Sequence, residues 1–303
     1  MAIETQTERT MHNAQTERAI YNTPENFFDW SWPAVPRHQF IDERDRAYDT
    51  NGPNGLIELD VSAALGTPYP ATTPAILARY VKICSGGSLS HAFNASGEIY
   101  YVLEGSGNST NGADTVAWDV GDVFCLPGGN ETHHAAAHTA ILFVVTNEPL
   151  LAFENLRAPA PGESRSEAVH WPHAEIEKHL QKIYKRPKTD QASGVAIQFS
   201  TPATAPSCNT IPMINTAINT LESGGNQRPH RHNGAAITLA IEGEGIHSMI
   251  GEQKVSWTTG AAQITPAAEL HSHHNRGNRR MRSFVVQDEG LHFYLRTPGF
   301  SWE

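Results

Sequence analysis

The chain has 303 residues, 39% hydrophobic and 8% aromatic, and its 22 lysines and arginines against 32 aspartates and glutamates give a formal net charge of −10. This length allows two ordinary domains with buried cores. The negative charge argues against nucleic acid as a partner. Cys84, Cys125 and Cys208 are widely spaced and form no C-x-x-C pair, so neither a disulfide framework nor a thiolate zinc site is indicated.

The N-terminal region is polar and mixed in charge, without the apolar core of a signal peptide. No apolar run reaches the roughly 18 residues that a membrane span needs. We therefore expect a cytoplasmic protein with no membrane partner. The stretch TPENFFDW, residues 23–30, predicts a short helix with Thr23 as its cap and Pro24 in its first turn.

Short β-branched or aromatic runs bounded by Gly, Asn and Pro predict strands over residues 75–83, 98–105, 139–146, 235–243 and 281–287. Turn signals recur about every ten residues, as expected for an antiparallel sandwich or barrel. Between the two groups of strands lies a Pro-rich segment. It is followed by HAEIEKHLQKIYK, residues 173–185, where Ile176, Leu180 and Ile183 have the spacing of an amphipathic helix.

An internal repeat organises these strands. Residues 85–107 align without a gap to residues 223–245, at a constant offset of 138 from Ser-Gly-Gly to Glu-Gly-x-Gly. Residues 118–127 align to residues 257–266 at an offset of 139, because the second copy has one more residue in the intervening turn. Agreement in two separate blocks indicates a duplicated unit.

Histidines gather in both copies, and the second copy has the pattern of a metal site. His230 and His232 lie two apart on one predicted strand, so both side chains point to the same face. His271 follows the Pro266 turn and would reach the same interior from a facing strand. Neutral imidazoles suit first-row transition metals, and three buried rings are costly as mere packing. We expect a metal held by His230, His232 and His271.

The first copy lacks this trio. The gap-free alignment places Ala92, Asn94 and Thr132 at the three ligand positions. His91 and His133 are each displaced by one residue, which turns a strand side chain to the opposite face, unless the register shifts and returns them to the interior. The first barrel is therefore expected to be a degenerate scaffold without metal.

The two copies also differ in an acidic residue that only the first copy has. Glu98 of the first copy aligns with Ala236 of the second, so the copy with the histidines has no acidic ligand. Three neutral ligands leave a divalent ion its full charge, and an octahedral ion keeps three open positions. This suits an anionic substrate that chelates through two oxygens, with the third position left for dioxygen.

The spacing of Gly224, His230, His232, Gly260, Pro266 and His271 resembles the two motifs of the cupin superfamily. The resemblance covers both repeats, although the first lacks the histidines, so the chain resembles a bicupin, with two tandem double-stranded β-helix (jelly-roll) barrels and a few short helices in an all-β fold. We expect an N-terminal region and degenerate barrel over residues 1–155, a linker and helix over 156–190, and a metal-binding barrel over 191–303.

HRHNGAAITLAIEGEG and TPAAELHSHHN further resemble the metal motifs of gentisate 1,2-dioxygenase and its relatives that act on salicylate. The resemblance implies Fe(II) on the three histidines, with His273 as the catalytic residue that contacts substrate or relays a proton. It implies substrate contacts at Asn275, Asn219 and Thr238, although the family usually has glutamine at the Asn219 position and a carboxylate-binding arginine at the Thr238 position. The arginines of RGNRRMR, residues 276–282, lie in a solvated turn, or one of them replaces that partner.

The resemblance implies an enzyme whose partners are a small aromatic acid and O2. Two other classes stay open: a cupin metalloenzyme using Zn, Mn or Ni as hydrolase, isomerase or decarboxylase, and a non-catalytic metal-binding bicupin with a narrow apolar second barrel. We also expect a homo-oligomer, since exposed barrel edges commonly pair between subunits.

Overall fold

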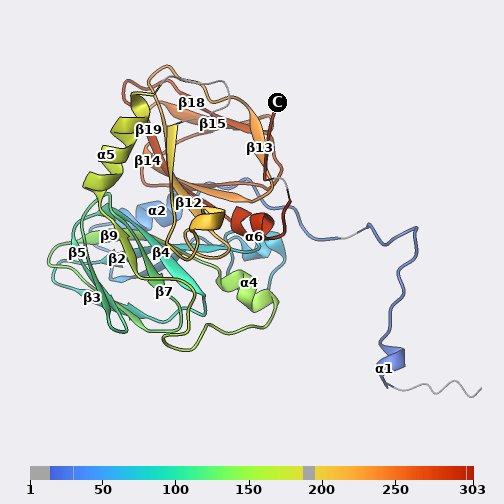
Figure 1. The fold of residues 1–303 in the computed structure, drawn as a ribbon. Helices are drawn as coiled ribbons and strands as arrows, with labels where there is room; N and C mark the ends of the chain where they lie inside the picture. The colour runs from blue at the N-terminus through green and yellow to red at the C-terminus, as the bar shows by residue number, and fades with distance from the viewer. Residues whose placement is uncertain (1–13, 30, 187–194, 298) are drawn as a thin grey trace, which may run out of the picture. The chain divides into compact units, whose positions relative to one another are not determined.

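The computed structural model of the chain describes residues 14–29, 31–186, 195–297 and 299–303, and it divides into two compact units, residues 1–33 and 34–303 (Figure 1). The small unit contains α1 (Ala14–Glu17). The helix predicted over residues 23–30 is wrong for its described part, residues 23–29, while residue 30 lies outside the described residues: residues 24–28 form hydrogen-bonded turns, and the Thr23 amide donates to Oδ1 of Asn26 at 2.9 Å. Phe27 and Phe28 are exposed, so no buried face stabilises a helix there.

The large unit consists of antiparallel sheets, two in each half of the sequence, which confirms the all-β prediction. In the first half, one sheet has the order β1-β2-β9-β4-β7-β10 and the other β3-β8-β5-β6. Their bounds are β1 (Gly55–Glu58), β2 (Leu77–Ile83), β3 (Ser88–His91), β4 (Gly97–Glu104), β5 (Gly107–Asn111), β6 (Asp114–Trp118), β7 (Val123–Pro127), β8 (Thr132–Ala135), β9 (Ala140–Thr146) and β10 (Val169–Trp171).

The second half repeats this plan, with sheets in the orders β11-β12-β19-β14-β17 and β16-β15-β18-β13-β20. Their bounds are β11 (Val195–Phe199), β12 (Asn215–Leu221), β13 (His230–His232), β14 (Ala236–Glu242), β15 (Ile246–Ile250), β16 (Gln253–Ser256), β17 (Ala262–Thr265), β18 (His271–Asn275), β19 (Met281–Gln287) and β20 (Phe300–Trp302). We call the two halves the first and second barrel. The duplication inferred from sequence is thus visible in the topology.

Short helices connect and cover the sheets: α2 (Ile41–Tyr48), α3 (Ser62–Leu65), α4 (Glu148–Phe153), α5 (His173–Tyr184), the 3-10 turn η1 (Ala205–Ser207) and α6 (Glu289–Tyr294). The predicted helix at residues 173–185 is confirmed as α5, which buries Ile176 and Leu180. Among the described residues, no helix has both the length and the apolar character to span a bilayer.

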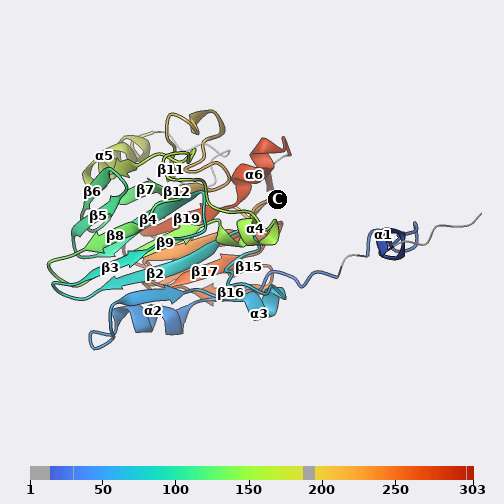
Figure 2. The same cartoon turned by 90° about the horizontal axis from the view of Figure 1, so that it is seen from below.

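The largest core lies where the two barrels pack against each other. The central strands of both barrels lie close together (Figure 2). Alternate residues of these strands point into the interface, and Phe284 of β19 meets Tyr101 of β4 and Phe143 of β9, with ring centroids 5.4 and 6.5 Å apart. The opposite faces of the same strands point into the barrels, as the period of a strand requires. One face of each central sheet therefore joins the barrels and the other face lines a barrel interior.

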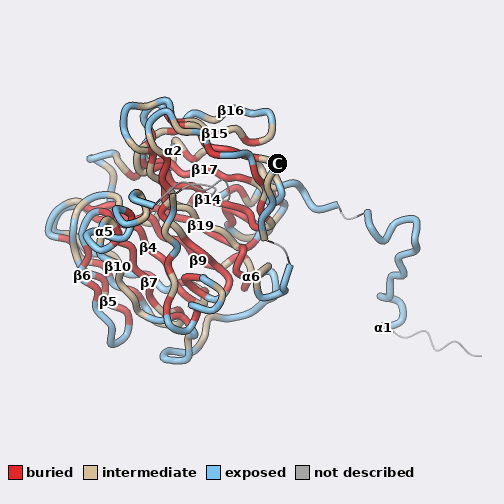
Figure 3. The backbone as a smooth tube through the Cα atoms, turned by 45° about the horizontal axis from the view of Figure 1, so that its top comes forward, coloured by how far each residue is buried: buried red, intermediate tan, exposed pale blue. Residues whose placement is uncertain are grey.

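Large apolar side chains pack inside the first barrel. Large apolar residues of both sheets form a single buried cluster between them, including Val81, Tyr100, Phe124, Leu126 and Leu142. The central strands of both barrels are buried along most of their length (Figure 3). In the second barrel the corresponding apolar cluster is small and consists of Leu221, Ala240, Ile246, Trp257 and Met281.

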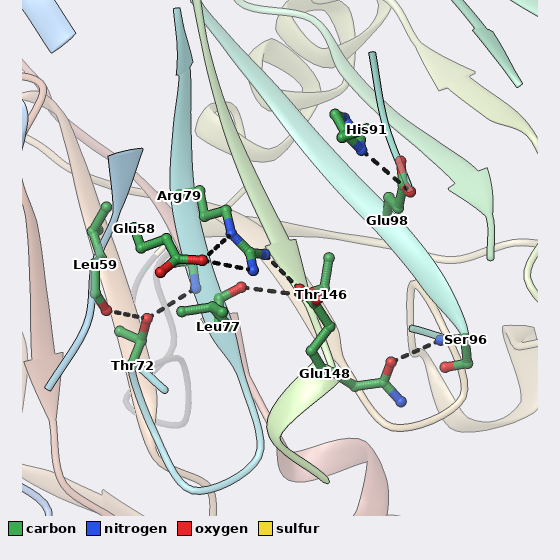
Figure 4. A network of polar contacts seen from close by, with 12 residues as sticks. Glu58, Leu59, Thr72, Leu77, Arg79, His91, Ser96, Glu98, Thr146 and Glu148 are labelled. Atoms are coloured by element: carbon green, nitrogen blue, oxygen red, sulfur yellow. Dashed lines mark hydrogen bonds and ion pairs between the residues drawn. The ribbon is translucent and has the colours of Figure 1, made fainter. Parts of the chain in front are cut away.

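A buried arginine anchors one end of the first barrel. Arg79 of β2 is 5% exposed, and its guanidinium pairs with Glu58 of β1 at 3.1 Å and with Glu148 of α4 at 2.5 Å (Figure 4). Thr146 of β9 also donates to Glu148, at 2.8 Å. Two carboxylates compensate one buried cation, as buried charges require.

Two hydrogen bonds to the segment around β17 supplement the packing between the barrels. The Phe40 amide, which precedes α2, donates to the Ala262 carbonyl of β17 at 2.9 Å, and Tyr80 of β2 donates to the Gly260 carbonyl at 2.7 Å. Within the predicted linker, β10 pairs with β7 of the first barrel. The predicted domain boundary at residue 190 lies outside the described residues, so the division proposed from sequence stays a prediction.

Candidate metal centre

His230, His232 and His271 converge in the second barrel. His230 and His232 lie on β13, and His271 is the direct antiparallel neighbour of His230 on β18. Ring centroids of His271 lie 4.2 Å from His230 and 4.5 Å from His232. One potential ligand atom from each ring lies within 4.8 Å of the others, and among the described residues this is the one such group of His, Cys, Asp or Glu side chains.

Backbone carbonyls fix the tautomer of all three rings. Nδ1 of His230 donates to the Arg228 carbonyl at 3.0 Å, Nδ1 of His232 to Gly234 at 2.7 Å, and Nδ1 of His271 to Glu269 at 2.9 Å. A carbonyl only accepts, so each Nδ1 carries the proton and each Nε2 keeps its lone pair. This carbonyl support is the usual outer shell of a histidine that binds metal.

Burial keeps these imidazoles neutral. Desolvation lowers the pKa of His230, lowers that of His232 to about 4, and lowers that of His271 to about 2, where the two neighbouring rings contribute further. Neutral Nε2 atoms are therefore available throughout the physiological pH range. The donor set fits a divalent first-row transition metal.

A hydroxyl group fixes the orientation of His273. Ser248 Oγ receives hydrogen bonds from Trp257 Nε1 at 2.8 Å and from Gln263 Nε2 at 2.7 Å. Its own proton therefore goes to Nδ1 of His273, 2.9 Å away. With Nδ1 accepting, Nε2 of His273 carries the proton, and this ring, which lines the same cavity as the triad, is a hydrogen-bond donor.

The C-terminal strand covers the ligand strand. β20 pairs with β13, so that Trp302 lies opposite His230 and Phe300 opposite His232. The Phe300 ring stacks on His230 with centroids 5.0 Å apart, and it lines the cavity. An aromatic side chain thereby restrains the ligand ring and forms part of the cavity wall.

The triad opens onto a cavity of about 320 Å³ inside the second barrel. This volume lies within the range of small-molecule sites. Of the predicted substrate contacts, Thr238 and Asn219 line it, as does Ala236. The remaining lining residues are mostly small or neutral polar groups: Ala196, Gln198, Ala217, Gln227, Thr265, Val285, Gln287, Glu289 and Phe300.

Asn275 lies elsewhere. Its Nδ2 donates to the carbonyls of Leu221 at 3.0 Å and Arg279 at 2.8 Å, and its Oδ1 accepts from the Gly277 amide at 2.9 Å. The side chain is fully buried and is not part of the cavity lining. The structure therefore corrects the expectation of a substrate contact at Asn275, because the donors and the oxygen of its side-chain amide are already used in hydrogen bonds to backbone groups.

The arginines of residues 276–282, one of which was a candidate to replace the missing carboxylate-binding arginine, also lie outside the cavity lining. Arg279 faces Glu242 at 3.3 Å, and Arg282 faces Glu177 at 2.7 Å. The guanidinium of Arg280 lies over the Tyr184 ring, and Arg276 binds the Asn226 side chain. The interpretation as a surface turn is the correct one for this cluster.

Strand pairing corrects the expected correspondence between the barrels. In the first barrel His91 pairs with Thr132, and in the second His230 pairs with His271. The structural equivalents of His230 and His232 are therefore His91 and Phe93, not Ala92 and Asn94. His91 lies seven positions before Glu98, whereas His230 lies six positions before Ala236, so the first barrel has one residue more between these points, which a gap-free alignment conceals.

The first barrel consequently has two inward histidines, neither in a triad. His91 is buried, with Nε2 3.0 Å from Nε2 of His134. His133 points outward and is exposed, as the sequence argument expected. Glu98 accepts from Tyr100 at 2.6 Å and from Thr132 at 2.8 Å, and it lies 3.9 Å from His91 (Figure 4). Glu98 is thus held by two hydroxyl donors, whereas Nδ1 of His91 has no hydrogen-bond partner within the described residues.

Comparison with known proteins identifies the architecture. The Cupin domain family matches residues 217–287, which span β12 to β19. Salicylate 1,2-dioxygenase from Pseudaminobacter salicylatoxidans superposes with a TM-score of 0.76 at 13% identity, covering 100% of this chain and 99% of that one. The chain is a bicupin by fold. This confirms the predicted fold class and the resemblance on which it rested.

Other solved structures agree. A variant of the same dioxygenase in complex with gentisate superposes with a TM-score of 0.76 at 14% identity and covers 99% of this bicupin and 98% of that chain. A cupin 2 conserved barrel domain protein from Leptotrichia buccalis gives a TM-score of 0.53 at 10% identity, with 84% and 97% covered. A search of curated protein sequences gives no match.

Proposed function

We propose that this bicupin is an Fe(II)-dependent dioxygenase that cleaves the ring of a hydroxylated aromatic carboxylate similar to gentisate or salicylate. The observation that carries the proposal is the set of three buried imidazoles, each with Nε2 unprotonated, that opens onto a cavity with Ala236 in place of an acidic ligand. The gentisate complex of a protein with the same fold supports the substrate class.

The residues fit Fe(II) and leave it accessible. Three neutral nitrogens hold a divalent ion without cancelling its charge, which favours an anionic ligand beside it. Bound there, Fe(II) would supply neighbouring positions for a chelating substrate and O2 and a route for electrons between them. A non-catalytic metal-binding bicupin would have a narrow apolar second barrel. The cavity of about 320 Å³ beside the three histidines instead supports a role in ligand binding.

The protein contributes position and hydrogen bonds. Nε2–H of His273, held by Ser248, donates to a ligand oxygen in the cavity and stabilises negative charge there. In this tautomer His273 is a donor and not a base, which narrows the catalytic role expected from sequence. Thr238 and Asn219 bound the space beside it, and Phe300 presents an aromatic face on the wall that carries His230.

Metal analysis followed by oxygen uptake tests the proposal. Protein purified without added metal, then reloaded anaerobically with Fe(II), should consume O2 with hydroxybenzoates as substrates. Zn, Mn or Ni loading should give no uptake. Oxygen-independent turnover with one of these metals would instead support a hydrolase, isomerase or decarboxylase, and an intact site without turnover of any chelating acid would support a non-catalytic bicupin.

A further inference from the structure

The second-barrel cavity has no cationic side chain. Its lining contains neither arginine nor lysine among the described residues, whereas it contains one carboxylate, that of Glu289. At the strand position of Ala217 in this cavity, the first barrel has Arg79, since Ala217 pairs with Val285 and Arg79 with Val144 in the two copies. The fold therefore accommodates an arginine at this position, but the cavity lacks it.

Glu289 reaches the cavity from the sheet that faces the imidazoles. It begins α6 directly after β19, and it is 6% exposed. Nδ2 of Asn215 donates to Oε2 of Glu289 at 3.3 Å and to Oε1 of Gln287 at 3.2 Å. Within the described residues no hydrogen bond reaches Oε1 of Glu289, so one carboxylate oxygen remains as an acceptor.

Two further buried atoms in the lining have no partner. Oε1 of Gln227 and Oγ1 of Thr265 are buried and make no hydrogen bond within the described part of the chain, and both residues line the cavity. A buried polar atom without a partner is costly, and a bound molecule would satisfy it. Gln227 Oε1 can only accept, as can ionised Glu289. Besides the Nε2–H donor of His273, the cavity therefore offers acceptors that a donor group of a bound molecule would satisfy.

We propose that the substrate carries a hydrogen-bond donor, a hydroxyl or an amino group, away from its chelating oxygens, and that Glu289 accepts this bond and excludes substrates with a second carboxylate. The inference rests on the proposed function, in which the chelating end of the substrate occupies the three-histidine site. A second carboxylate would meet Glu289 with no arginine or lysine in the cavity lining to compensate its charge, and like charges brought together at a desolvated site select against the wrong ligand.

Binding to Co(II)-loaded protein tests this without turnover, because the visible spectrum of Co(II) reports directly on its ligands. The probes are salicylate and its ring-hydroxylated, ring-aminated and ring-carboxylated derivatives, which share one chelating group. Burial raises the pKa of Glu289 to about 7, so the titrations are made near pH 8, where its carboxylate is ionised. The wild type should bind the hydroxylated and aminated probes at least about tenfold more tightly than the carboxylated one, as expected for a hydrogen bond to a charged acceptor.

Two variants locate the effect. Glu289→Gln keeps an oxygen for Asn215 and should remove most of the discrimination against the carboxylated probe, with unchanged Co(II) content and thermal unfolding. Ala217→Arg should strengthen binding of the carboxylated probe alone. Equal affinities of the wild type for all derivatives, or a discrimination that persists in Glu289→Gln, would overturn the inference and leave the proposed function standing. Failure of every probe, including salicylate, to alter the Co(II) spectrum would overturn the proposed function itself.

Discussion

The two barrels share a strand plan and differ in what fills them. At matched positions of the central sheets, the first barrel has large side chains where the second has small or polar ones. The pairs, with the first barrel named first, are Val81 and Asn219, Tyr100 and Thr238, Phe124 and Gln263, Leu126 and Thr265, and Leu142 and Ser283. The cavity thus results from many substitutions in the sheet that faces the ligands, and not from the ligand strands alone.

Both barrels have a histidine that is hydrogen-bonded to a serine hydroxyl, which in turn accepts from a tryptophan. His134 Nδ1 lies 2.6 Å from Ser109 Oγ, which accepts from Trp118 Nε1 at 2.8 Å, just as Ser248 and Trp257 hold His273. In the first barrel Nε2 of His134 faces the His91 ring, whereas His273 lines an open cavity. The hydrogen-bonded histidine therefore belongs to the scaffold, and its surroundings decide whether it can meet a ligand.

The largest expected effect is the loss of metal and activity when a histidine ligand is removed from the second barrel but not when a histidine is removed from the first. His271→Ala removes one of three ligands and should abolish activity, by at least about a thousandfold, because too few nitrogens remain to hold the ion. The fold should survive, since the core between the barrels is untouched. His91→Ala in the first barrel is the matched control and should leave metal content unchanged. Two tightly bound metal ions per chain, one of them lost in His91→Ala, would show that both barrels bind metal.

A second variant moves the carboxylate from one barrel to the other. Ala236→Glu places at the second site the residue that the first barrel has as Glu98. Its carboxylate would cancel one unit of metal charge and occupy one open position, so metal affinity should hold or rise while turnover of a chelating substrate falls by about a hundredfold or more. Oxygen uptake and metal content of the same preparation measure both. Normal turnover by the metal-loaded variant would contradict the argument from three open positions.

The sequence predicted the barrels and the triad because both depend on local spacing. A period of two places His230 and His232 on one face, and repeated turn signals delimit the strands. The register of His91 could not be predicted, since a loop one residue longer is invisible to a gap-free alignment. Glu289 was missed because its approach to the cavity depends on how α6 follows β19. Asn275 was misassigned because its partners, the Leu221 and Arg279 carbonyls, are set by tertiary structure.

Exchanging a large interior residue of the first barrel with its small counterpart in the second tests whether ligand binding depends on the cavity. Thr238→Tyr introduces the counterpart of Tyr100 and should occupy the ligand space, so that salicylate binds the Co(II)-loaded protein at least about tenfold more weakly while metal content is retained. The reverse change, Tyr100→Thr, should lower the free energy of unfolding by about 3 kcal/mol through the void it creates. Undiminished ligand binding in Thr238→Tyr would place the substrate outside the cavity.

The smallest expected effect concerns the buried carboxyl group that the first barrel kept. Burial raises the pKa of Glu98 to about 7, and hydrogen bonds from Tyr100 and Thr132 only partly oppose this. Between about pH 4.5 and 7 the unfolded chain releases this proton while the folded chain retains it. Stability therefore falls as pH rises through that window, and the full destabilisation remains above it.

Glu98→Gln removes this ionisation and keeps an oxygen that can accept from Tyr100. The variant should exceed the wild type in free energy of unfolding by about 2 kcal/mol near pH 8, and the difference should nearly vanish at about pH 3.5, where the wild-type carboxyl is largely protonated in both states. The buried His91 and His134 are present in both proteins, so their own loss of stability in acid cancels in the comparison. Denaturant unfolding at both pH values measures the difference. If Glu98→Gln were the less stable protein at pH 8, the ionised carboxylate would be a net stabilising acceptor, and the first barrel would be maintained by its charge and not despite it.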